Sequence, residues 1–244
     1  MAVRRLRVDG VLQGIGIAVG LLALVGGFVL LAVQYRPYSV PTDSMAPTVH
    51  PGDTVLAHPV KGSQVGRGDI IVFSDPVWGT SAMVKRVIGV GGDTVACCDS
   101  AGRTTVNGKP VTESYVNTSS SSAVLLGDKP FSAKVPAGRL FLMGDNRSVS
   151  LDSRSHLEIT EGTIPESEVK ARVEGTVWPL STARTIGRTS AFDAVPGPAA
   201  TAHGPLPELE WTIIGGAALV LLSAAAGTVV AQLRKRSAKR GRSS

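Results

Sequence analysis

Two long apolar segments enclose a chain of shorter apolar runs. Residues 11 to 33 are apolar except for Gln13, and residues 211 to 231 carry no charged side chain. About 20 apolar residues in a helix cross the ~30 Å hydrocarbon layer of a bilayer, so each segment predicts a transmembrane helix. The first segment is longer than the apolar core of about 7–15 residues in a secretory signal, which favours an uncleaved anchor.

Between these segments the pattern is typical of strands. Residues 54 to 56, 70 to 73 and 94 to 95 are short β-branched or apolar runs, and each follows a Gly-Asp dipeptide that predicts a turn. Residues 82 to 90 and 140 to 143 are further strand candidates. Asn107-Gly108 predicts a tight hairpin within a stretch, 99 to 135, that has the character of an inserted module. The pattern therefore predicts a mainly β fold.

Composition divides the chain further. Residues 181 to 210 are rich in Ala, Gly, Thr and Pro, which is typical of a linker. We predict the following division: a basic N-terminus at 1–10, a transmembrane helix at 11–33, a folded domain at 36–180 with an inserted subregion at about 99–135, a linker at 181–210, a transmembrane helix at 211–231 and a basic tail at 232–244.

The formal charge of +6 depends on the two ends of the chain. Nine of the 25 basic residues lie before the first apolar segment or after the second, and the stretch from 36 to 210 carries a formal charge of −2. Nucleic acid is therefore not an expected partner. Because basic residues favour the cytoplasmic side, we predict a multi-pass protein of the cell membrane, with both termini in the cytoplasm and the folded domain outside.

The chain has two cysteines, the adjacent pair Cys97-Cys98. Outside the cytoplasm such a pair can form a disulfide, although neighbouring residues do so only with a constrained backbone. Two sulfurs with no nearby histidine make a poor zinc site, so no metal is predicted. The sequence leaves a vicinal disulfide and two free thiols as open alternatives, both with a local structural role.

Candidate chemistry begins with Ser44 and Lys85. Ser44 lies in a polar turn between Pro41 and Pro47, and by itself such a serine is usually a solvated turn residue. Lys85 lies in a strand whose two faces are otherwise apolar; in many edge strands such a cation extends to water. Burial, however, lowers the pKa of a lysine and can leave it neutral and basic, which the adjacent Arg86 cannot become. A neutral Lys85 beside Ser44 would form a Ser-Lys nucleophile and base pair.

A histidine-based triad is the competing arrangement. None of the four histidines, His50, His58, His156 and His203, lies within a catalytic motif, and His203 falls in the predicted linker. Structural or exposed roles are therefore the better interpretation of all four.

Four ordered blocks of sequence resemble the type I signal peptidases, the membrane-bound Ser/Lys proteases that remove signal peptides. The blocks are Ser44-Met45-x-Pro47-Thr48, then Arg67-Gly68-Asp69-Ile70-Ile71-Val72-Phe73, then Lys85-Arg86-Val87-Ile88-Gly89-Val90-Gly91-Gly92-Asp93, and last Gly144-Asp145-Asn146-Arg147-Ser148-x-Ser150-x-Asp152-Ser153-Arg154. They extend over residues 40 to 154 and leave the second apolar segment uncovered.

The resemblance implies a role for individual residues. Ser44 would be the nucleophile and Lys85 the general base, with Ser150 orienting the lysine. An ion pair between Asp152 and Arg154 would support the same loop. The resemblance further places Asp145 and Asn146 in that loop, and it implies neither a metal nor another cofactor.

An oxyanion hole is also implied, because developing charge must be met by hydrogen-bond donors. The backbone N–H of Ser44 is one implied donor. The Thr42 hydroxyl is the second, at a position where some members have serine and others glycine.

The resemblance implies an antiparallel β catalytic domain with a smaller inserted β region. Exported preproteins would bind as an added strand, with small apolar pockets for alanine-like side chains, at the surface of the lipid bilayer. The predicted pocket residues, whose apolar character suits a core equally well, are Val40, Pro41, Met45, Val49, Val72, Met83 and Val84.

Two other functions remain as alternatives. A self-cleaving protease of the repressor type shares the Ser/Lys pair, but the two anchors and the lack of a DNA-binding helix pair argue against it. A catalytically idle β domain could instead bind exported proteins or cell-wall components. The presence of both Ser44 and Lys85 argues against this second alternative.

Overall fold

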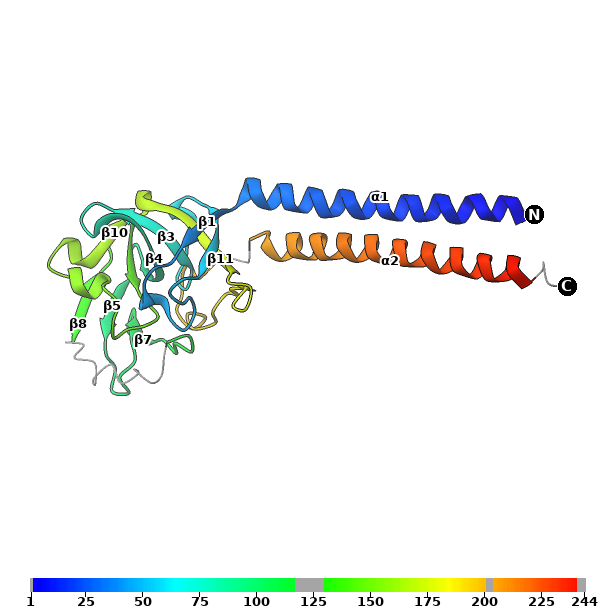
Figure 1. Cartoon of the computed structure of the whole chain (residues 1–244). Coiled ribbons are helices and arrows are strands. Elements are labelled where there is room, and N and C mark those ends of the chain that lie inside the picture. Colours follow the sequence, from blue (N-terminus) through cyan, green and yellow to red (C-terminus); the bar gives the residue numbers. More distant parts are fainter. Residues whose placement is uncertain (1, 117–129, 201–203, 241–244) are drawn as a thin grey trace. The chain divides into compact units, whose positions relative to one another are not determined.

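The computed structural model describes residues 2–116, 130–200 and 204–240. Parts of four predicted segments lie outside the described residues: residue 1 of the N-terminus, 117–129 of the inserted subregion, 201–203 of the linker and 241–244 of the tail. The chain forms two compact units, which we call the helical unit (Met1–Gln34 with Pro205–Ser244) and the β unit (Tyr35–Gly204). Figure 1 shows the elements of both units.

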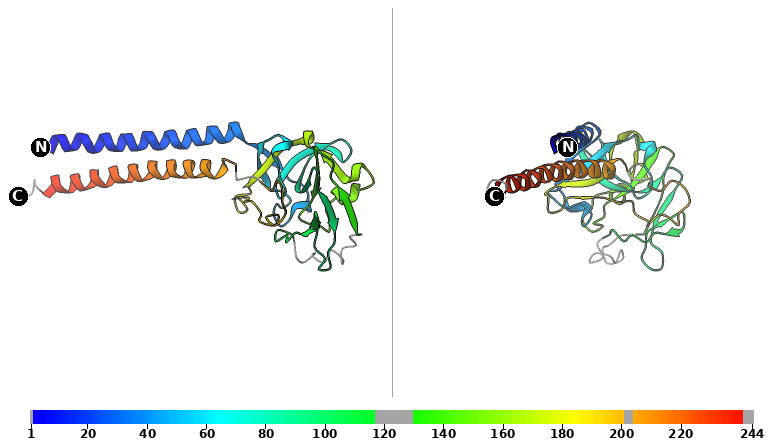
Figure 2. Two further views of the ribbon diagram at one scale, coloured as in Figure 1. Left: turned by 180° about the vertical axis from the view of Figure 1, so that it is seen from behind. Right: turned by 90° about the vertical axis from the view of Figure 1, so that its right-hand side faces the viewer.

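The helical unit consists of α1 (Ala2–Gln34) and α2 (Leu206–Arg240), which pack side by side in antiparallel directions (Figures 1 and 2). Glycine allows their backbones to approach closely, because a Cβ atom on Gly20 would lie only 2.8 Å from the carbonyl oxygen of Gly216. Among the described residues, two stretches, Gly10–Gln34 and Leu206–Leu233, are long and apolar enough to cross a membrane.

The larger sheet of the β unit is antiparallel throughout its described strands. Its order is β1 (Arg36–Ser39), β2 (Thr54–Pro59), β11 (Val169–Trp178), β3 (Ile70–Asp75), β4 (Gly79–Val90), β9 (Arg139–Met143) and β10 (Thr163–Pro165), with β12 (Arg184–Thr185) paired to β11. The connections include the short 3₁₀ helices η1 (Asp43–Met45), η2 (Gly62–Gln64), η4 (Ser153–His156), η5 (Thr160–Gly162) and η6 (Glu166–Glu168).

The smaller sheet has the order β7 (Lys109–Pro110), β6 (Thr105–Val106), β5 (Thr94–Cys97) and β8 (Phe131–Lys134). It is connected to the larger sheet where β4 ends and the turn before Thr94 begins. Asn107 and Gly108 both have positive φ in the β6–β7 hairpin, as a two-residue type I′ turn requires. The structure therefore matches the expectation of a mainly antiparallel β protein that carries a second, smaller sheet.

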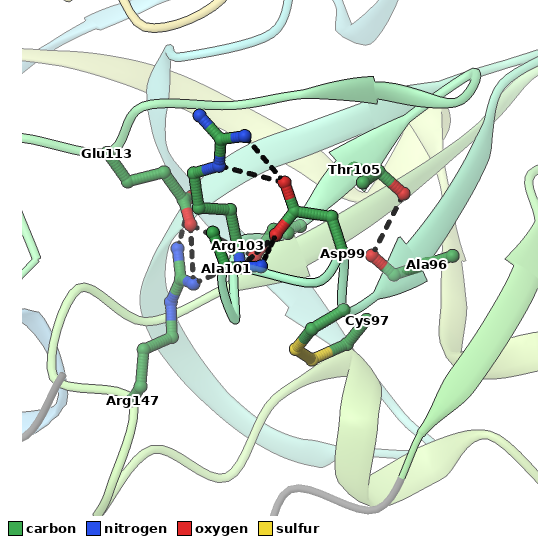
Figure 3. Close-up of a disulfide and its surroundings, with 10 residues drawn as sticks. Ala96, Cys97, Asp99, Ala101, Arg103, Thr105, Glu113 and Arg147 are labelled. Carbon is green, nitrogen blue, oxygen red and sulfur yellow. Dashed lines mark hydrogen bonds and ion pairs between the residues drawn. A yellow bond between two sulfur atoms is a disulfide. The ribbon is translucent and has the colours of Figure 1, made fainter. Parts of the chain in front are cut away.

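Cys97 and Cys98 are joined by a disulfide at the end of β5, which is the first of the two alternatives left open by the sequence (Figure 3). The loop that follows is organised by Asp99. Its carboxylate accepts hydrogen bonds from the backbone N–H of Ala101 and from the backbone and guanidinium of Arg103. The disulfide and this turn together follow the end of β5, which is an interior strand of the smaller sheet.

The strands predicted from the sequence are confirmed. The runs at 54–56, 70–73, 82–90, 94–95 and 140–143 lie in β2, β3, β4, β5 and β9, respectively. In each case a buried face accounts for the pattern, as in β3, where residues 70 to 73 are all buried. Burial on both sides suits a strand in the interior of a sheet.

The structure differs from the predicted linker over residues 181–200. Phe192 and Val195 are almost fully buried, in the same apolar cluster as Ile88, Phe141 and Met143. The segment also forms strand β12 and makes a bridge from Ala199 to the loop before β3. A composition rich in Ala, Gly and Pro is shared by linkers and by irregular segments that a few apolar anchors hold in place, so composition alone does not separate them.

Candidate active site

Ser44 is held in η1 by the residues on either side of it. Met45 is fully buried in an apolar cluster that also contains Val40 and Val49, so the turn is anchored both before and after the serine. The backbone N–H groups of Ala46 and Val49 donate to the carbonyls of Asp43 and Met45, at 3.2 and 2.9 Å. As a result the Ser44 side chain occupies a fixed place and is 6% exposed.

Lys85 comes from β4, where it pairs with Ile71 of β3 in the middle of the larger sheet. Its Nζ lies 2.8 Å from Ser44 Oγ and donates to the Val84 carbonyl at 3.2 Å. The lysine is 5% exposed. The two residues that the sequence singled out, 41 positions apart, are thus within hydrogen-bond distance.

The environment of Lys85 favours its neutral form. Burial lowers the pKa of the lysine, while the negative charges of Asp152 and Asp145 act in the opposite direction and leave a net decrease. A neutral amine has a lone pair that can accept a proton from a hydroxyl. The serine and lysine therefore have the geometry and the proton affinity of a nucleophile and its base.

Both carboxylates near Lys85 are themselves bound by arginines. Asp145 accepts from Arg86 Nε at 2.8 Å and from its Nη2 at 2.6 Å, and it also accepts from the Thr48 hydroxyl. Asp152 accepts from Nε and Nη2 of Arg154, each at 2.9 Å. Both aspartates are completely buried. Each therefore has a counter-charge close by, as a buried ion requires.

The ion pair predicted for Asp152 and Arg154 is present in the structure. Burial alone would raise the pKa of Asp152, but the hydrogen bonds and charge of Arg154 outweigh it and hold that pKa below its usual value. Asp152 also accepts from the backbone N–H of Gly144 at 2.9 Å. The anionic carboxylate thus ties the end of β9 to the loop that carries Ser150.

Ser150 lies beside the serine-bearing turn, separated from it by Gly144. A side chain at Gly144 would collide with both Ser150 Oγ and the Ser44 carbonyl oxygen, so only glycine fits between them. The buried Ser150 hydroxyl makes no hydrogen bond of regular geometry with the described residues, although it lies close enough to the Asp152 carboxylate to help lower the pKa of that group. The structure thus places Ser150 next to the pair, but it does not contain the predicted hydrogen bond to Lys85.

Asn146 links the same loop directly to η1. Its backbone N–H donates to the Ser44 carbonyl at 3.1 Å, and its side-chain amide donates to the Asp43 carboxylate at 3.0 Å. The amide oxygen accepts from the Ser148 hydroxyl at 2.9 Å. The predicted loop residue is therefore in contact with the serine-bearing turn.

Thr42, the implied second oxyanion donor, is exposed and lies just before η1. Its Oγ1 is 3.3 Å from Ser44 Oγ. The hydroxyl is thus close to the position where an attacked carbonyl would sit, next to the nucleophile.

The predicted pocket residues fall into two groups. Val40, Met45, Val49 and Val72 are buried in one apolar cluster, with the half-buried Val84 packed against it. Met83 packs against a second cluster on the opposite side of the sheet, and Pro41 is exposed. The structure therefore places most of these side chains beneath the serine-bearing turn, where they also form part of the core.

An open strand edge lies next to Lys85. On one side β4 pairs with β3 as far as Gly79, but on the other side β9 pairs only with the part of β4 that begins at Arg86. In the part of the chain that the structure describes, residues 79 to 85 of β4 have no second strand partner. This edge can accept an extended peptide by main-chain hydrogen bonding.

The partner of Asp145 was missed by the sequence analysis, which considered Arg86 only as a cation unable to act as a base. A guanidinium on an otherwise apolar strand face requires a buried counter-charge, and that requirement was the available signal. A further ion pair, between Arg147 and Glu113, was also missed. Within the described residues no group of three or more His, Cys, Asp or Glu side chains is arranged to hold a metal ion.

Comparison with known proteins assigns the chain to a family. The model of the family described as "Signal peptidase, peptidase S26" matches residues 12–178, which is well over half of the chain. The chain belongs to this signal peptidase family. The match begins in α1 and ends with β11, so it includes most of α1, the smaller sheet, the larger sheet apart from β12, and every residue of the candidate site.

Individual signal peptidases are similar over most of the chain. A protein of Mycobacterium leprae named probable signal peptidase I is 34% identical over 220 residues, covering 68% of this chain and 74% of that protein. Signal peptidase I T of Bacillus subtilis is 33% identical over 180 residues, covering 70% of this chain and 86% of that protein. A crystal structure of a signal peptidase I from Enterococcus faecalis is 29% identical, with a TM-score of 0.34, and covers 43% of this chain and 93% of that one.

The lowered pKa of Lys85 predicts how peptidase activity changes with pH. A base that acts in its neutral form predicts that kcat/KM falls about tenfold for each pH unit below the pKa of Lys85. The measurement is cleavage of a peptide substrate by the full chain in detergent between pH 5 and pH 9. Recovery of activity after a return to high pH controls for unfolding, and a flat profile down to pH 5 would contradict a neutral lysine base.

Proposed function

We propose that Ser44 and Lys85 are the nucleophile and general base with which this signal peptidase removes N-terminal signal peptides from exported preproteins. The family match supports the reaction, and the similar proteins are named for it. The observation that carries the residue assignment is the 2.8 Å separation between Lys85 Nζ and Ser44 Oγ, in a setting that favours the neutral amine.

In the first step Ser44 Oγ attacks the carbonyl carbon of the scissile peptide bond while its proton passes to Lys85 Nζ. The tetrahedral intermediate then collapses, and Lys85 returns the proton to the departing amine, which is the new N-terminus of the mature protein. The signal peptide is left as an ester on Ser44. Lys85 both accepts and returns the proton in this step, so no second titrating group is needed.

In the second step water attacks the ester. Lys85, again neutral, accepts a proton from the water as its oxygen bonds to the carbonyl carbon, and returns it to Ser44 Oγ as the ester bond breaks. The signal peptide leaves with a free carboxylate. The Ser150 hydroxyl, buried beside Ser44, supports Lys85 during this cycle by accepting a hydrogen bond from its charged form.

Substrate binding rests on the open edge of β4. An extended preprotein segment added along residues 79 to 85 would place its carbonyls beside Ser44 and Lys85. Val84 lies on this edge over the buried cluster of Met45, Val49 and Val72, which gives it a small apolar floor suited to alanine-sized side chains. Val40 completes the cluster and Pro41 is exposed beside it, whereas Met83 packs on the other side of the sheet.

The two candidate spans support a membrane location. We propose further that both basic ends are cytoplasmic and that the β unit lies outside, at the bilayer surface where signal peptides emerge. Under this topology residues 1–10 and 232–244 are cytoplasmic tails, and residues 11–33 and 211–231 are the two membrane spans. The family match favours neither an idle binding domain nor a repressor-type protease.

Removing either member of the pair should abolish processing. Membranes carrying Ser44→Ala or Lys85→Ala should leave a preprotein with an alanine-ended signal peptide uncleaved, because the nucleophile or its base is gone. The measurement is the ratio of mature protein to preprotein on a gel. Ser132→Ala and Lys134→Ala, two exposed residues of β8, are matched controls that should retain full processing. Normal cleavage by either active-site variant would refute the assignment.

The oxyanion role of Thr42 makes a separate prediction. Thr42→Val keeps the shape of the side chain but removes the hydroxyl, and it should lower kcat by about 10²-fold with KM little changed. Thr42→Ser should retain most of the activity, since it keeps a donor. Steady-state kinetics on a peptide substrate distinguish the two variants, and a Thr42→Val enzyme as fast as the parent would remove Thr42 from the mechanism.

A further inference from the structure

The smaller sheet region contributes a buried acid to the back of the active site. The Glu113 carboxylate accepts from Arg147 Nη1 at 2.8 Å and also from Arg147 Nη2, as Figure 3 shows. It accepts further from the Thr104 hydroxyl at 3.0 Å and from the Tyr115 hydroxyl at 2.7 Å. Burial would raise the pKa of Glu113, but the charge and hydrogen bonds of Arg147 outweigh it, so the group stays anionic.

Tyr115 joins this acid to the arginine next to the catalytic lysine. Its ring lies against the Arg86 guanidinium, with the central carbon 3.9 Å from the ring centroid. One edge of the same guanidinium, formed by Nε and Nη2, donates to Asp145, and its Nη1 donates to the Gly68 carbonyl at 2.8 Å. Arg86 is 3% exposed, so the ring is the wall that closes its pocket on this side.

We propose that Tyr115 is a positioning residue for Lys85, which it serves by holding the Arg86 guanidinium against Asp145 and by keeping water from that ion pair. Glu113 fixes the tyrosine through the hydroxyl, and Arg147 fixes Glu113. The inference rests on the proposed roles of Ser44 and Lys85, and it gives the smaller sheet a function in the reaction.

The groups around Lys85 explain why the Tyr115 ring affects the lysine. Asp145 and Asp152, from the loop between β9 and η4, are the charges that face the lysine, and Ser44 of η1 faces it as an uncharged hydroxyl. Arg86, from the lysine's own strand, and Arg154, from η4, bind the two carboxylates. When Arg86 loses its hold on Asp145, the carboxylate attracts a proton to Lys85 more strongly; when water enters, the ammonium is better solvated.

Both effects have the same sign. Each raises the pKa of Lys85, so a variant without the ring should lose activity at a higher pH than the parent. A ring that serves only to stabilise the fold would reduce the amount of active protein at every pH and leave the midpoint of the acid limb where it was. The midpoint of the pH profile therefore separates a positioning role from a purely structural one.

The test compares three variants of the full chain in detergent. Tyr115→Met fills similar space without a ring, and its acid limb in kcat/KM should move up by about half a pH unit or more. Tyr115→Phe keeps the ring over Arg86 and should retain a midpoint close to that of the parent. Phe131→Met removes another partly buried aromatic residue, which packs on the same cluster but stacks on Phe141 instead of Arg86, and it should leave the midpoint unchanged.

A smaller amount of folded protein does not obscure the result. The midpoint is found by comparing the rates of one variant at different pH values, and the amount of enzyme cancels in that comparison. An unshifted midpoint for Tyr115→Met, or an equal shift for Phe131→Met, would overturn the proposal. Lys85→Ala is assayed alongside: its inactivity together with an unshifted Tyr115→Met would overturn the positioning role and leave the proposed function in place. An active Lys85→Ala enzyme would overturn the proposed function itself.

Discussion

A lysine amine can act as a base only while it lacks a proton, and this fold achieves that by burying the amine. Burial lowers the pKa of Lys85, yet two carboxylates, Asp145 and Asp152, lie close enough to raise it again. An uncompensated anion at either position would favour the ammonium form of Lys85, which cannot accept a proton. The arrangement therefore depends on one arginine for each aspartate, at 2.6 to 2.9 Å.

Strand alternation places Arg86, the first of these arginines, directly after Lys85 in β4. Lys85 and Arg86 are neighbours on β4, so their side chains point to opposite faces, one toward Ser44 and the other toward Asp145. Asp145 follows β9, the strand next to β4 in the sheet. In the same loop the backbone N–H of Asn146 donates to the Ser44 carbonyl. Lys85, the Asp145 counter-charge of Arg86, and Ser44 are thus fixed by one set of hydrogen-bonded elements, and such a preorganised geometry is what the proposed reaction requires.

How much the sequence could predict depends on how far apart along the chain the contacting residues lie. Ser44 and Lys85 were accessible, because a cation on an apolar strand and a polar turn after an anchor are local features, and the family resemblance added Ser150, Asp152 and Arg154. The contact from Tyr115 to Arg86 was not accessible, since it joins the loop after β7 to β4 and no periodicity records it. The packing of residues 181–200 was hidden for a similar reason: Phe192 and Val195 are isolated apolar residues whose burial depends on surfaces formed elsewhere in the chain.

The central claim concerns one proton on one amine, and NMR can follow that proton directly. The full chain, labelled with ¹³C at lysine Cε, is titrated in detergent, and the Lys85 resonance is assigned as the signal absent from Lys85→Ala. Our account predicts a midpoint well below the ordinary lysine value of about 10.4. A Lys85 that titrates at the ordinary value would contradict it, because the amine would then be charged at neutral pH and unable to activate Ser44.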